Sequence, residues 1–457
     1  MPLRAVEMGL SGWAGRPRER SWVVRPEHRT EVAEALRVAM ARGSAVARGR
    51  GTAYGDVAMN RHGGVVATDR LRRLLAFQSD TGLLTCEAGV PLRDVVEFAL
   101  PRGFFPAVTP GTWKATVGGC LACDVHGKNH HVAGSFAQHV TEFRLLTASG
   151  DVVVCTQEGT PELFWATAGG LGLTGVILDV TLRLRRVATS AVRVRYRKLA
   201  DLDATFAALE EDEPEPYSVA WLDVLARGKK LGRSVLMLGD HAAPGELPPP
   251  WRSAPFALPP TRAIRLPFAP PPGVLSAPAV RLFNAFFYRR FSSRDEPVVQ
   301  GLRPYFYPLE AIDNFNRLYG KPGFVEYQVA LPRAAARDVF RTILERLSAR
   351  GYGSFLAVVK RLGAGNQAPL SFPSDGYTVV VDIPARDERL FPILSSLDEL
   401  VAMQGGRVYL AKDARLDARL VDAMYPGRAE WAALLDRFDP ERCFTSSLSR
   451  RLALRGP

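Results

Sequence analysis

A run of cysteine, histidine and lysine residues in the first third of the chain holds side chains that can do chemistry. The run is Cys120-Leu-Ala-Cys123-Asp124-Val-His126-Gly-Lys128-Asn-His-His131. Two cysteines separated by two residues, with histidines nearby, can bind zinc or form a redox dithiol. The spacing matches no standard zinc module and no second such cysteine pair follows, so we predict no metal site. His126 and Lys128 suit a redox site, where histidine accepts protons and lysine holds a phosphate; a solvated turn is the other interpretation.

Three glycine clusters can expose backbone N–H groups to a phosphate. They are Ala47-Arg-Gly-Arg-Gly-Thr-Ala-Tyr-Gly-Asp56, Pro110-Gly-Thr112 and Thr116-Val-Gly-Gly119. Each alone is typical of a tight turn, but three in one short span favour a bound phosphate-bearing cofactor. A fourth pattern, Gly170-Leu-Gly-Leu-Thr-Gly175, spells the dinucleotide fingerprint. Because residues 176–184 predict a strand where that fingerprint requires a helix, we do not interpret it as a nicotinamide site.

The elements that must position these motifs form an α+β pattern. Apolar periodicity predicts helices over residues 31–42 and 91–101 and strands over residues 44–48, 83–88, 143–147, 152–155 and 176–184. A new mixture of strands and helices begins after about position 190. Residues 243–272 interrupt it with eleven of the chain's 34 prolines. Because proline lacks the N–H donor, we expect a long loop there without helix or sheet, acting as a lid or disordered.

Composition indicates a folded protein with two or three domains: the chain has 457 residues, of which 47% are hydrophobic and 23% charged. The 59 basic and 47 acidic residues leave a net charge of +12, which favours nucleic acid, phosphorylated substrates or an anionic membrane as partner. Apolar runs are too short for a membrane span and charges interrupt the first twenty residues, so we expect neither a transmembrane helix nor a signal peptide. Five cysteines predict reduced thiols rather than a disulfide framework.

The motifs, read in order, resemble the flavin-binding half of the decaprenylphosphoryl-β-D-ribose 2′-oxidase family, which belongs to the vanillyl-alcohol-oxidase superfamily of FAD proteins. The matching stretches of that half are residues 48–56, 110–112, 116–119, 122–131, 162–167 and 172–175. The likeness continues through residues 220–221, 230–233, 327–328, 366–373, 411–413 and 424–426. It spans nearly the whole chain and is weakest in the first 25 residues and the proline-rich segment.

The resemblance implies an FAD-binding domain of the PCMH type made from two separated pieces, residues 1–190 and 407–457. An α+β substrate domain, residues 191–406, lies between them and includes the lid loop 243–272. The implied cofactor contacts lie in the glycine loops and around the histidine motif: Ala47, Arg48, Gly49, Gly51, Thr52, Ala53, Tyr54, Gly55, Asp56, Gly111, Thr116, Val117, Gly118, Gly119, Cys123, Asp124, His126, Gly175, Ile177 and Tyr409. Tyr54 stands where relatives often carry a histidine that tethers the flavin, so noncovalent FAD is expected.

The family reaction oxidises the ribose 2′-hydroxyl of a polyprenyl-phosphate sugar to a ketone, and a separate NADH-dependent keto-reductase completes the epimerisation to arabinose. Lys412 matches the essential lysine of the family, His126 is the expected proton acceptor and Tyr54 an apolar wall of the catalytic site. The expected substrate contacts are Lys128, Trp221, Tyr307, Gln328, Lys360, Asp382 and Lys412. A quinone or another acceptor would reoxidise the flavin. The lipid-linked substrate implies peripheral membrane contact, on the cytoplasmic face by preference and on the periplasmic side as the alternative. We expect this contact in residues 243–291, where aromatic and basic residues that favour an anionic membrane surface gather: Trp251, Arg252, Phe256, Leu258, Arg262, Ile264, Arg265, Leu266, Phe268, Arg281, Phe283, Phe286, Phe287, Tyr288, Arg289, Arg290 and Phe291.

Some positions depart from the family pattern. Cys120 replaces an alanine, Val380 a cysteine and Glu326 a glutamine next to Tyr327-Gln328. An aldonolactone or alditol oxidase of the same superfamily, acting on a soluble sugar, is the alternative function. Nucleic-acid binding is the alternative from another class, but the basic residues are scattered and no nucleic-acid motif occurs, so we expect none.

Overall fold

The computed structural model describes residues 3–211, 215–258, 263–266, 274–293 and 296–456. Its amino-terminal part contains a sheet in the order β1-β2-β4-β3, formed by β1 (Val6–Ser11), β2 (Arg18–Val24), β3 (Ala45–Arg48) and β4 (Gly64–Ala67). Helix α1 (Val32–Met40) contacts β2 and β4. It buries Val32, Leu36 and Ala39, whose spacing gives one apolar face. The helix expected over residues 31–42 is therefore present, with slightly shorter ends.

The second sheet is formed by strands between residues 74 and 186. Its path is β5 (Leu74–Gln78), β6 (Leu83–Glu87), β10 (Val176–Arg186), β8 (Val140–Leu146) and β9 (Val152–Thr156), and β7 (Phe104–Pro106) pairs with β10. The helices of this part are α2 (Leu92–Ala99), α3 (Val117–Ala122), α4 (His130–Ala133) and α5 (Pro161–Thr167). Strand β10 follows Gly175 directly, so the fourth glycine pattern precedes a strand, as predicted.

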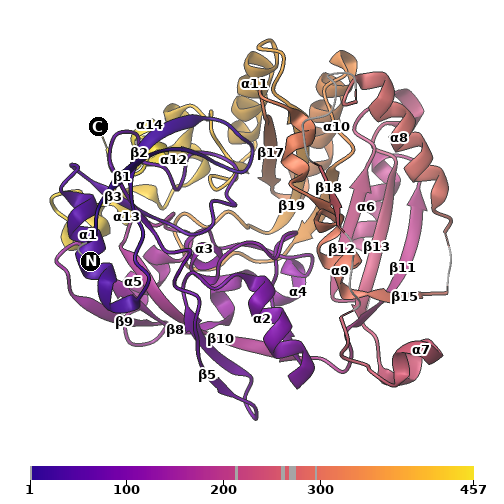
Figure 1. Cartoon of the computed structure of the whole chain (residues 1–457). Helices are drawn as coiled ribbons and strands as arrows, with labels where there is room; N and C mark the ends of the chain where they lie inside the picture. The colour runs from indigo at the N-terminus through magenta and orange to yellow at the C-terminus, as the bar shows by residue number, and fades with distance from the viewer. Residues whose placement is uncertain (1–2, 212–214, 259–262, 267–273, 294–295, 457) are drawn as a thin grey trace.

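The third sheet has eight strands. Its order is β15 (Val298–Gly301), β11 (Ala191–Leu199), β13 (Ser234–His241), β12 (Tyr217–Leu222), β18 (Ala357–Leu362), β19 (Gly376–Pro384), β17 (Phe324–Leu331) and β20 (Arg407–Val408). Its helices are α6 (Leu202–Glu210), α8 (Ala277–Arg290), α9 (Leu302–Phe306), α10 (Arg333–Arg350) and α11 (Leu390–Met403). Figure 1 shows the sheet between α10 and α11 on one side and the FAD-binding part on the other.

Successive side chains of β17 point to opposite faces of the sheet, and this alternation determines which of them reach the site. Val329 and Leu331 join the core with α10, so Glu326 and Gln328 point to the opposite face. That face is turned toward the glycine loops and lines the same cavity as they do. The α+β class predicted from sequence is confirmed by the mixture of sheets and helices.

The carboxyl-terminal segment returns to the first sheet. After β20 it forms α12 (Val421–Met424), α13 (Arg428–Phe438) and α14 (Ser447–Arg451), and Phe444 makes a parallel bridge with Ala45 beside β3. Figure 1 shows these yellow helices beside the indigo strands β1 to β3. Strand β20 is still paired with β17, so the large sheet extends just past the expected boundary at residue 407. The two-piece domain stays a proposal that this chain path supports.

The proline-rich segment has more structure than its composition predicts. It contains the short helix α7 (Pro249–Arg252), and β14 (Ile264–Arg265) pairs with β16 (Ile312–Asp313). The prolines of α7 occupy its first turn, where the missing N–H has no intrahelical partner to lose. The expectation of a loop without helix or sheet is therefore wrong for the described residues. Residues 259–262 and 267–272 of the expected lid lie outside the described part of the chain.

Candidate active site

One cavity brings together segments that are far apart in the sequence. It lies between the glycine loops and the large sheet. Of the expected cofactor residues, those that line it are Ala47, Gly49, Gly51, Thr52, Ala53, Tyr54, Gly111, Thr116, Gly118, Gly119, Cys123, His126, Gly175, Ile177 and Tyr409. Of the expected substrate residues, those that line it are Lys128, Gln328, Lys360 and Lys412. Residues expected to contact the flavin and residues expected to contact the substrate therefore line the same cavity.

The first glycine loop has the geometry of an anion site. No protein acceptor in the described part of the chain bonds the backbone N–H groups of residues 50–53, which follow β3. Gly51 has a φ of +66°, a conformation that favours glycine, and all four residues line the cavity. Free N–H groups that converge on a cavity are suited to phosphate. This loop therefore fits the pyrophosphate of FAD.

The loop 116–119 differs from the expected second anion nest. The N–H groups of Val117 and Gly118 donate to Val90 and Ala88 at 2.9 Å, and that of Gly119 donates to the Thr116 hydroxyl at 3.2 Å. These donors are already paired inside the protein. The glycines act instead through their small size, because a Cβ on Gly118 would lie 2.7 Å from that of Ala88. The absence of a side chain at Gly118 lets α3 pack closely against Ala88.

Three lysines make the substrate side of the cavity cationic. Lys128, Lys360 and Lys412 are half-buried in its wall. Desolvation lowers the pKa of Lys128 to about 7, that of Lys360 to about 8 and that of Lys412 to about 7. Lys128 is held in place by donating to the carbonyl of Tyr305. Clustered ammonium groups with low exposure suit a phosphate or phosphodiester better than a neutral sugar.

Lys412 is paired with a carboxylate that belongs to the large sheet. Its ammonium group donates to Glu326 Oε1 and lies 4.8 Å from the centre of the Tyr54 ring. The Glu326 carboxylate favours the charged form of Lys412, so it opposes the effect of burial on that pKa. The other oxygen, Glu326 Oε2, is buried and has no hydrogen-bond partner in the described chain. The pair joins the carboxyl-terminal piece to the substrate side.

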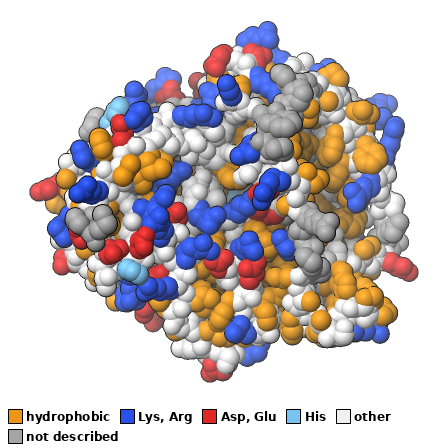
Figure 2. Space-filling view, in the orientation of Figure 1, with side chains coloured by type: hydrophobic (Ala, Val, Ile, Leu, Met, Phe, Trp, Pro, Cys, Tyr) orange, Lys and Arg blue, Asp and Glu red, His pale blue; other side chains and the backbone are white. Residues whose placement is uncertain are grey.

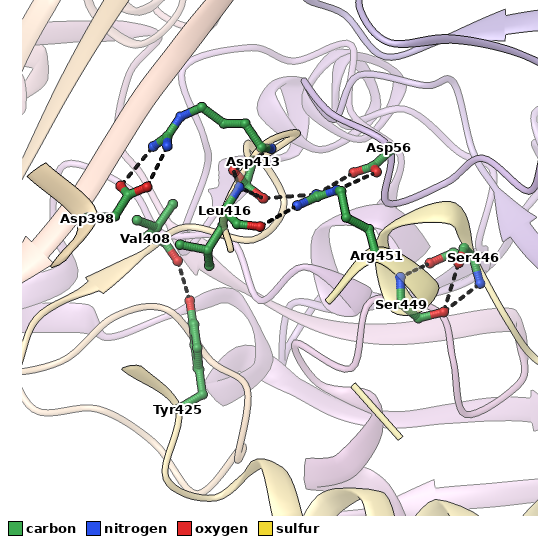
Figure 3. Close-up of polar contacts among 10 residues, drawn as sticks. Asp56, Asp398, Val408, Asp413, Leu416, Tyr425, Ser446, Ser449 and Arg451 are labelled. Carbon is green, nitrogen blue, oxygen red and sulfur yellow. Dashed lines mark hydrogen bonds and ion pairs between the residues drawn. The ribbon is translucent and has the colours of Figure 1, made fainter. Parts of the chain in front are cut away.

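A clamp from α14 fixes the backbone that carries Lys412. Figure 3 shows Arg451 between Asp56 and Asp413, at 2.9 Å from each carboxylate. Asp413 in turn accepts the backbone N–H groups of Arg415 and Leu416. The clamp ties the end of the first glycine loop to the residue that follows Lys412.

His126 lies against two aromatic rings and an amide. Its ring is 5.5 Å from Phe372 and 5.6 Å from Tyr409, and its Nε2 is 3.0 Å from the Gln328 amide nitrogen. Because the amide nitrogen is a donor, this Nε2 accepts and the ring is neutral. Burial and nearby lysines hold the pKa of His126 well below its ordinary value. Its Nδ1 has no partner in the described chain.

Several expected residues lie outside the cavity lining. They are Arg48, Gly55, Asp56, Val117, Asp124, Trp221, Tyr307 and Asp382. Trp221 donates to the Phe355 carbonyl, and the Tyr307 hydroxyl bonds Thr109. Asp382 is buried and accepts from Tyr319; burial raises its pKa to about 8. These side chains support the residues that line the cavity.

Sequence reasoning missed part of the lining. Trp13, Lys114, Phe306, Glu310 and Phe315 line the cavity from segments without a recognisable motif, and Arg50 lies within the first glycine loop but was not named as a site residue. Glu326 could have been found, because it lies two residues before Gln328 on a strand and so shares its face. Val380 lines the cavity where the family pattern has a cysteine, so no thiol is present at that position.

The cysteine pair has no site of its own. Burial raises the pKa of Cys123 to about 12 and that of Cys120 well above its ordinary value, which disfavours a reactive thiolate. Among the described residues, no group of three or more His, Cys, Asp or Glu side chains is placed to hold a metal ion.

Known proteins show similarity that agrees with this geometry. Residues 21–156 match the model of a family described as an FAD binding domain. The decaprenylphosphoryl-β-D-ribose oxidase of Mycolicibacterium smegmatis is 39% identical over 413 residues, which are 90% of this chain and 89% of that protein. The chain belongs to the decaprenylphosphoryl-β-D-ribose oxidase family. It is therefore an FAD-dependent oxidoreductase, as the family resemblance implied.

Two further proteins are similar to the chain. An uncharacterised protein of Streptomyces coelicolor is 40% identical over 377 residues, which are 80% of this chain and all of that protein. The L-gulono-1,4-lactone dehydrogenase of Mycobacterium tuberculosis is 24% identical over 454 residues, which are 96% and 98% of the two chains. The identity to the ribose oxidase is thus much higher than to the lactone dehydrogenase.

Proposed function

We propose that this flavoprotein oxidises the ribose 2′-hydroxyl of a polyprenylphosphoryl-β-D-ribose to the 2′-keto sugar. The observation that carries the proposal is the cavity that joins the first glycine loop to Lys128, Lys360 and Lys412. A neutral lactone or alditol would leave Lys128 and Lys360 without an anion to bind, whereas a sugar phosphodiester supplies one.

FAD, when bound, supplies the hydride acceptor for this oxidation. The free N–H groups of residues 50–53 bind its pyrophosphate, and Tyr54 and Tyr409 enclose the space between the loops and the sheet. Lys412 holds the oxygen of the reacting hydroxyl, and Lys128 and Lys360 bind the phosphodiester. The proton of the hydroxyl needs an acceptor in the same cavity, and His126 and Glu326 are both placed to supply one.

A substitution at Lys412 tests the proposal. Lys412→Ala is expected to fold and keep FAD, because Lys412 lines the cavity rather than the core, yet to reduce its flavin slower by about two or more orders of magnitude. Stopped-flow reduction with a synthetic polyprenylphosphoryl ribose measures the rate. Lys229→Ala, which changes an exposed lysine outside both this cavity and the neighbouring groove, is the matched control. Flavin reduction near the wild-type rate in Lys412→Ala would show that the role is misassigned.

The proposed reaction is the first half of an epimerisation to the arabinose derivative. A separate NADH-dependent keto-reductase is the proposed consumer of the ketone, and a quinone or another acceptor reoxidises the flavin. Both partners follow from the chemistry: a 2′-ketone must be reduced to give the epimer, and each turnover leaves two electrons on the flavin.

A lipid-linked substrate requires the protein to approach a bilayer, and α8 is the surface that we propose for this contact. Leu282, Phe283 and Phe286 are exposed at 74%, 44% and 67%. No ion pair in the described part of the chain involves the nearby Arg281, Arg289 or Arg290, which are exposed. Figure 2 shows hydrophobic side chains gathered over the α8 region at the right of the molecule. Apolar residues next to unpaired arginines suit an anionic membrane.

This surface is close to the site and is the carboxyl-terminal part of the region 243–291 that we expected to contact the membrane. The ring of Phe283 lies 5.8 Å from that of Phe355, whose neighbour Leu356 lines the cavity. Trp251, Phe256 and Leu258, which we expected to face the membrane, pack against hydrophobic clusters instead. Arg262 and Phe268, which we also expected to contact the membrane, lie outside the described residues. Within those residues no helix is long and apolar enough to span a bilayer.

Sedimentation with anionic vesicles tests the contact. Leu282→Gln/Phe286→Gln is expected to weaken vesicle binding by about tenfold or more, because each buried apolar side chain contributes about 1.5–3 kcal/mol. Val152→Gln/Val154→Gln, which changes exposed apolar residues on β9, is the control and should bind like wild type. Unchanged binding by the α8 variant, or self-association of the wild type through this face, would contradict the proposal.

A further inference from the structure

Glu326 occupies a place that neither the family reaction nor the expected site explains. It lines the main cavity and also a second groove on the other side of its pair with Lys412. The two spaces share Tyr54, Glu326 and Lys412 as a common wall. The outer groove is bordered by exposed residues such as Lys321 and Glu388. Glu326 therefore stands between the substrate cavity and a path to solvent.

The Glu326 carboxylate is buried but incompletely bonded. Its side chain is 2% exposed, Oε1 accepts from Lys412, and Oε2 has no partner in the described chain. A buried carboxylate oxygen without a donor is costly and is uncommon in folded proteins. A substrate hydroxyl in the cavity would supply the missing donor. The glutamine that the family pattern has at this position would offer an amide, which is a far weaker base than a carboxylate.

We propose that Glu326 Oε2 accepts the proton of the substrate hydroxyl that is oxidised, while Lys412 holds its oxygen. The inference rests on the proposed sugar oxidation. As the carbon–hydrogen bond breaks and its hydrogen leaves with both electrons to the flavin, the O–H bond breaks and the carbon–oxygen double bond forms. The hydroxyl proton moves to Glu326 Oε2 and leaves for solvent through the outer groove. The substrate loses two electrons, which the flavin gains.

His126 is the competing acceptor, and its surroundings suit the task less well. Its Nε2 is already occupied by the Gln328 amide, and its ring is enclosed by Phe372 and Tyr409. It lines the main cavity but not the outer groove, so it has no comparable exit for a proton. In this assignment His126 orients Gln328 and the ring beside it, which makes it a positioning residue.

Chemical rescue distinguishes a proton acceptor from a structural carboxylate. In anaerobic flavin reduction by polyprenylphosphoryl ribose, Glu326→Ala is expected to be slower by about 10²–10⁴-fold. Added formate, a small carboxylate, should restore a concentration-dependent part of the rate. Glu388→Ala, in the outer groove, should show no formate dependence. His126→Gln should keep FAD and lose less rate than Glu326→Ala.

A binding measurement gives a readout that does not depend on turnover. The reduced flavoprotein cannot oxidise the ligand, so its affinities for the ribosyl ligand and the 2′-deoxyribosyl analogue can be compared directly. The wild type should prefer the hydroxylated ligand by about tenfold, and Glu326→Ala should lose most of that preference. Flavin content and melting temperature show whether Glu326→Ala folds. If it does not, Glu326→Asp replaces it, and its rate of flavin reduction is expected to lie below that of the wild type and above that of an enzyme without a carboxylate at this position.

The outcomes separate this inference from the proposed function. Wild-type flavin that polyprenylphosphoryl ribose leaves oxidised would overturn both. A wild type that is reduced, with a Glu326→Ala rate within about tenfold of it, no formate rescue and an unchanged hydroxyl preference, would overturn the role of Glu326 alone. A larger loss in His126→Gln than in Glu326→Ala, with no formate rescue of Glu326→Ala, would assign the proton to the histidine.

Discussion

At the scale of residues, the lysines of the cavity determine how ligand affinity depends on pH. Lys128, with a pKa of about 7, and Lys360, with a pKa of about 8, are charged below these values and neutral above them. Their affinity for a phosphodiester is therefore present at low pH and lost as the pH rises through about 7 to 8. The dissociation constant of a polyprenyl phosphodiester, measured by titration calorimetry, should rise by about tenfold or more between about pH 6 and about pH 9.

Lys360→Gln tests whether the cavity lysines cause the pH dependence of phosphodiester affinity. The variant should bind more weakly at low pH and show a shallower rise, because one of the titrating groups is gone. Lys321→Gln, which alters an exposed lysine outside the cavity, should titrate like wild type. An affinity that is independent of pH in the wild type would contradict phosphodiester binding by these lysines.

Tyr54 determines how the cofactor is held. It lines the cavity as a neutral phenol, since burial raises its pKa well above the ordinary value. It has no nucleophilic ring nitrogen of the kind that tethers flavin in related enzymes. Denaturation by acid or heat should therefore release all FAD into the supernatant, as measured by absorbance after filtration. A flavin–peptide adduct in the digested protein would show that the cofactor is covalently bound.

Single residues also show where sequence reasoning reached its limit. The first glycine loop and Lys128 were named from local motifs, Lys360 and Lys412 from the family resemblance, and all of them meet in one cavity. Trp221 and Asp382 were named too, but the direction of a side chain on a strand depends on the register and packing of its neighbours. Glu326 was noticed only as a departure from the pattern. Its contact with Lys412 depends on chain segments 86 residues apart.

At the scale of elements, the return of α14 to the first glycine loop holds the site together. Asp56 and Asp413 are 4% and 1% exposed at the side chain, and Arg451 is their shared partner. Arg451→Met would leave two buried carboxylates without a cation, which costs about 3–5 kcal/mol when a buried pair is broken. The free energy of unfolding from urea titration measures this loss.

The matched control for this clamp is a surface pair. Arg419 and Asp417 are exposed at 83% and 44%, so Arg419→Met should change the free energy of unfolding by about 0–1 kcal/mol. Because the clamp adjoins Lys412, Arg451→Met should also retain less FAD after gel filtration than Arg419→Met does. Equal stability of the two variants would contradict the role of the clamp.

Periodicity predicted elements well where one face is buried. Helices α1 and α2 and strands β3, β6 and β10 lie within a few residues of their expected ranges. The proline-rich segment was predicted less well, because the missing N–H of proline is harmless in the first turn of α7. The partners of the large sheet could not be predicted, since β17 pairs with β19 and β20 across distant sequence.

At the scale of the whole molecule, two pieces of chain enclose one cavity with the large sheet. Figure 2 shows Lys and Arg side chains gathered across the middle of the face between the two halves. With a net charge of +12, the protein carries an electrostatic attraction for anionic lipids and for a phosphorylated substrate. This distribution agrees with a flavoprotein that works on a lipid-linked phosphosugar at a membrane surface.

Anaerobic reduction of the bound flavin by a synthetic polyprenylphosphoryl ribose tests this account most directly. The account predicts complete bleaching of the oxidised flavin band, one 2′-keto product per flavin by mass spectrometry, and no bleaching by L-gulono-1,4-lactone or free alditols. Bleaching by the soluble lactone or alditol, with none by the lipid-linked ribose, would contradict it and assign the cavity to the soluble-sugar branch of the superfamily.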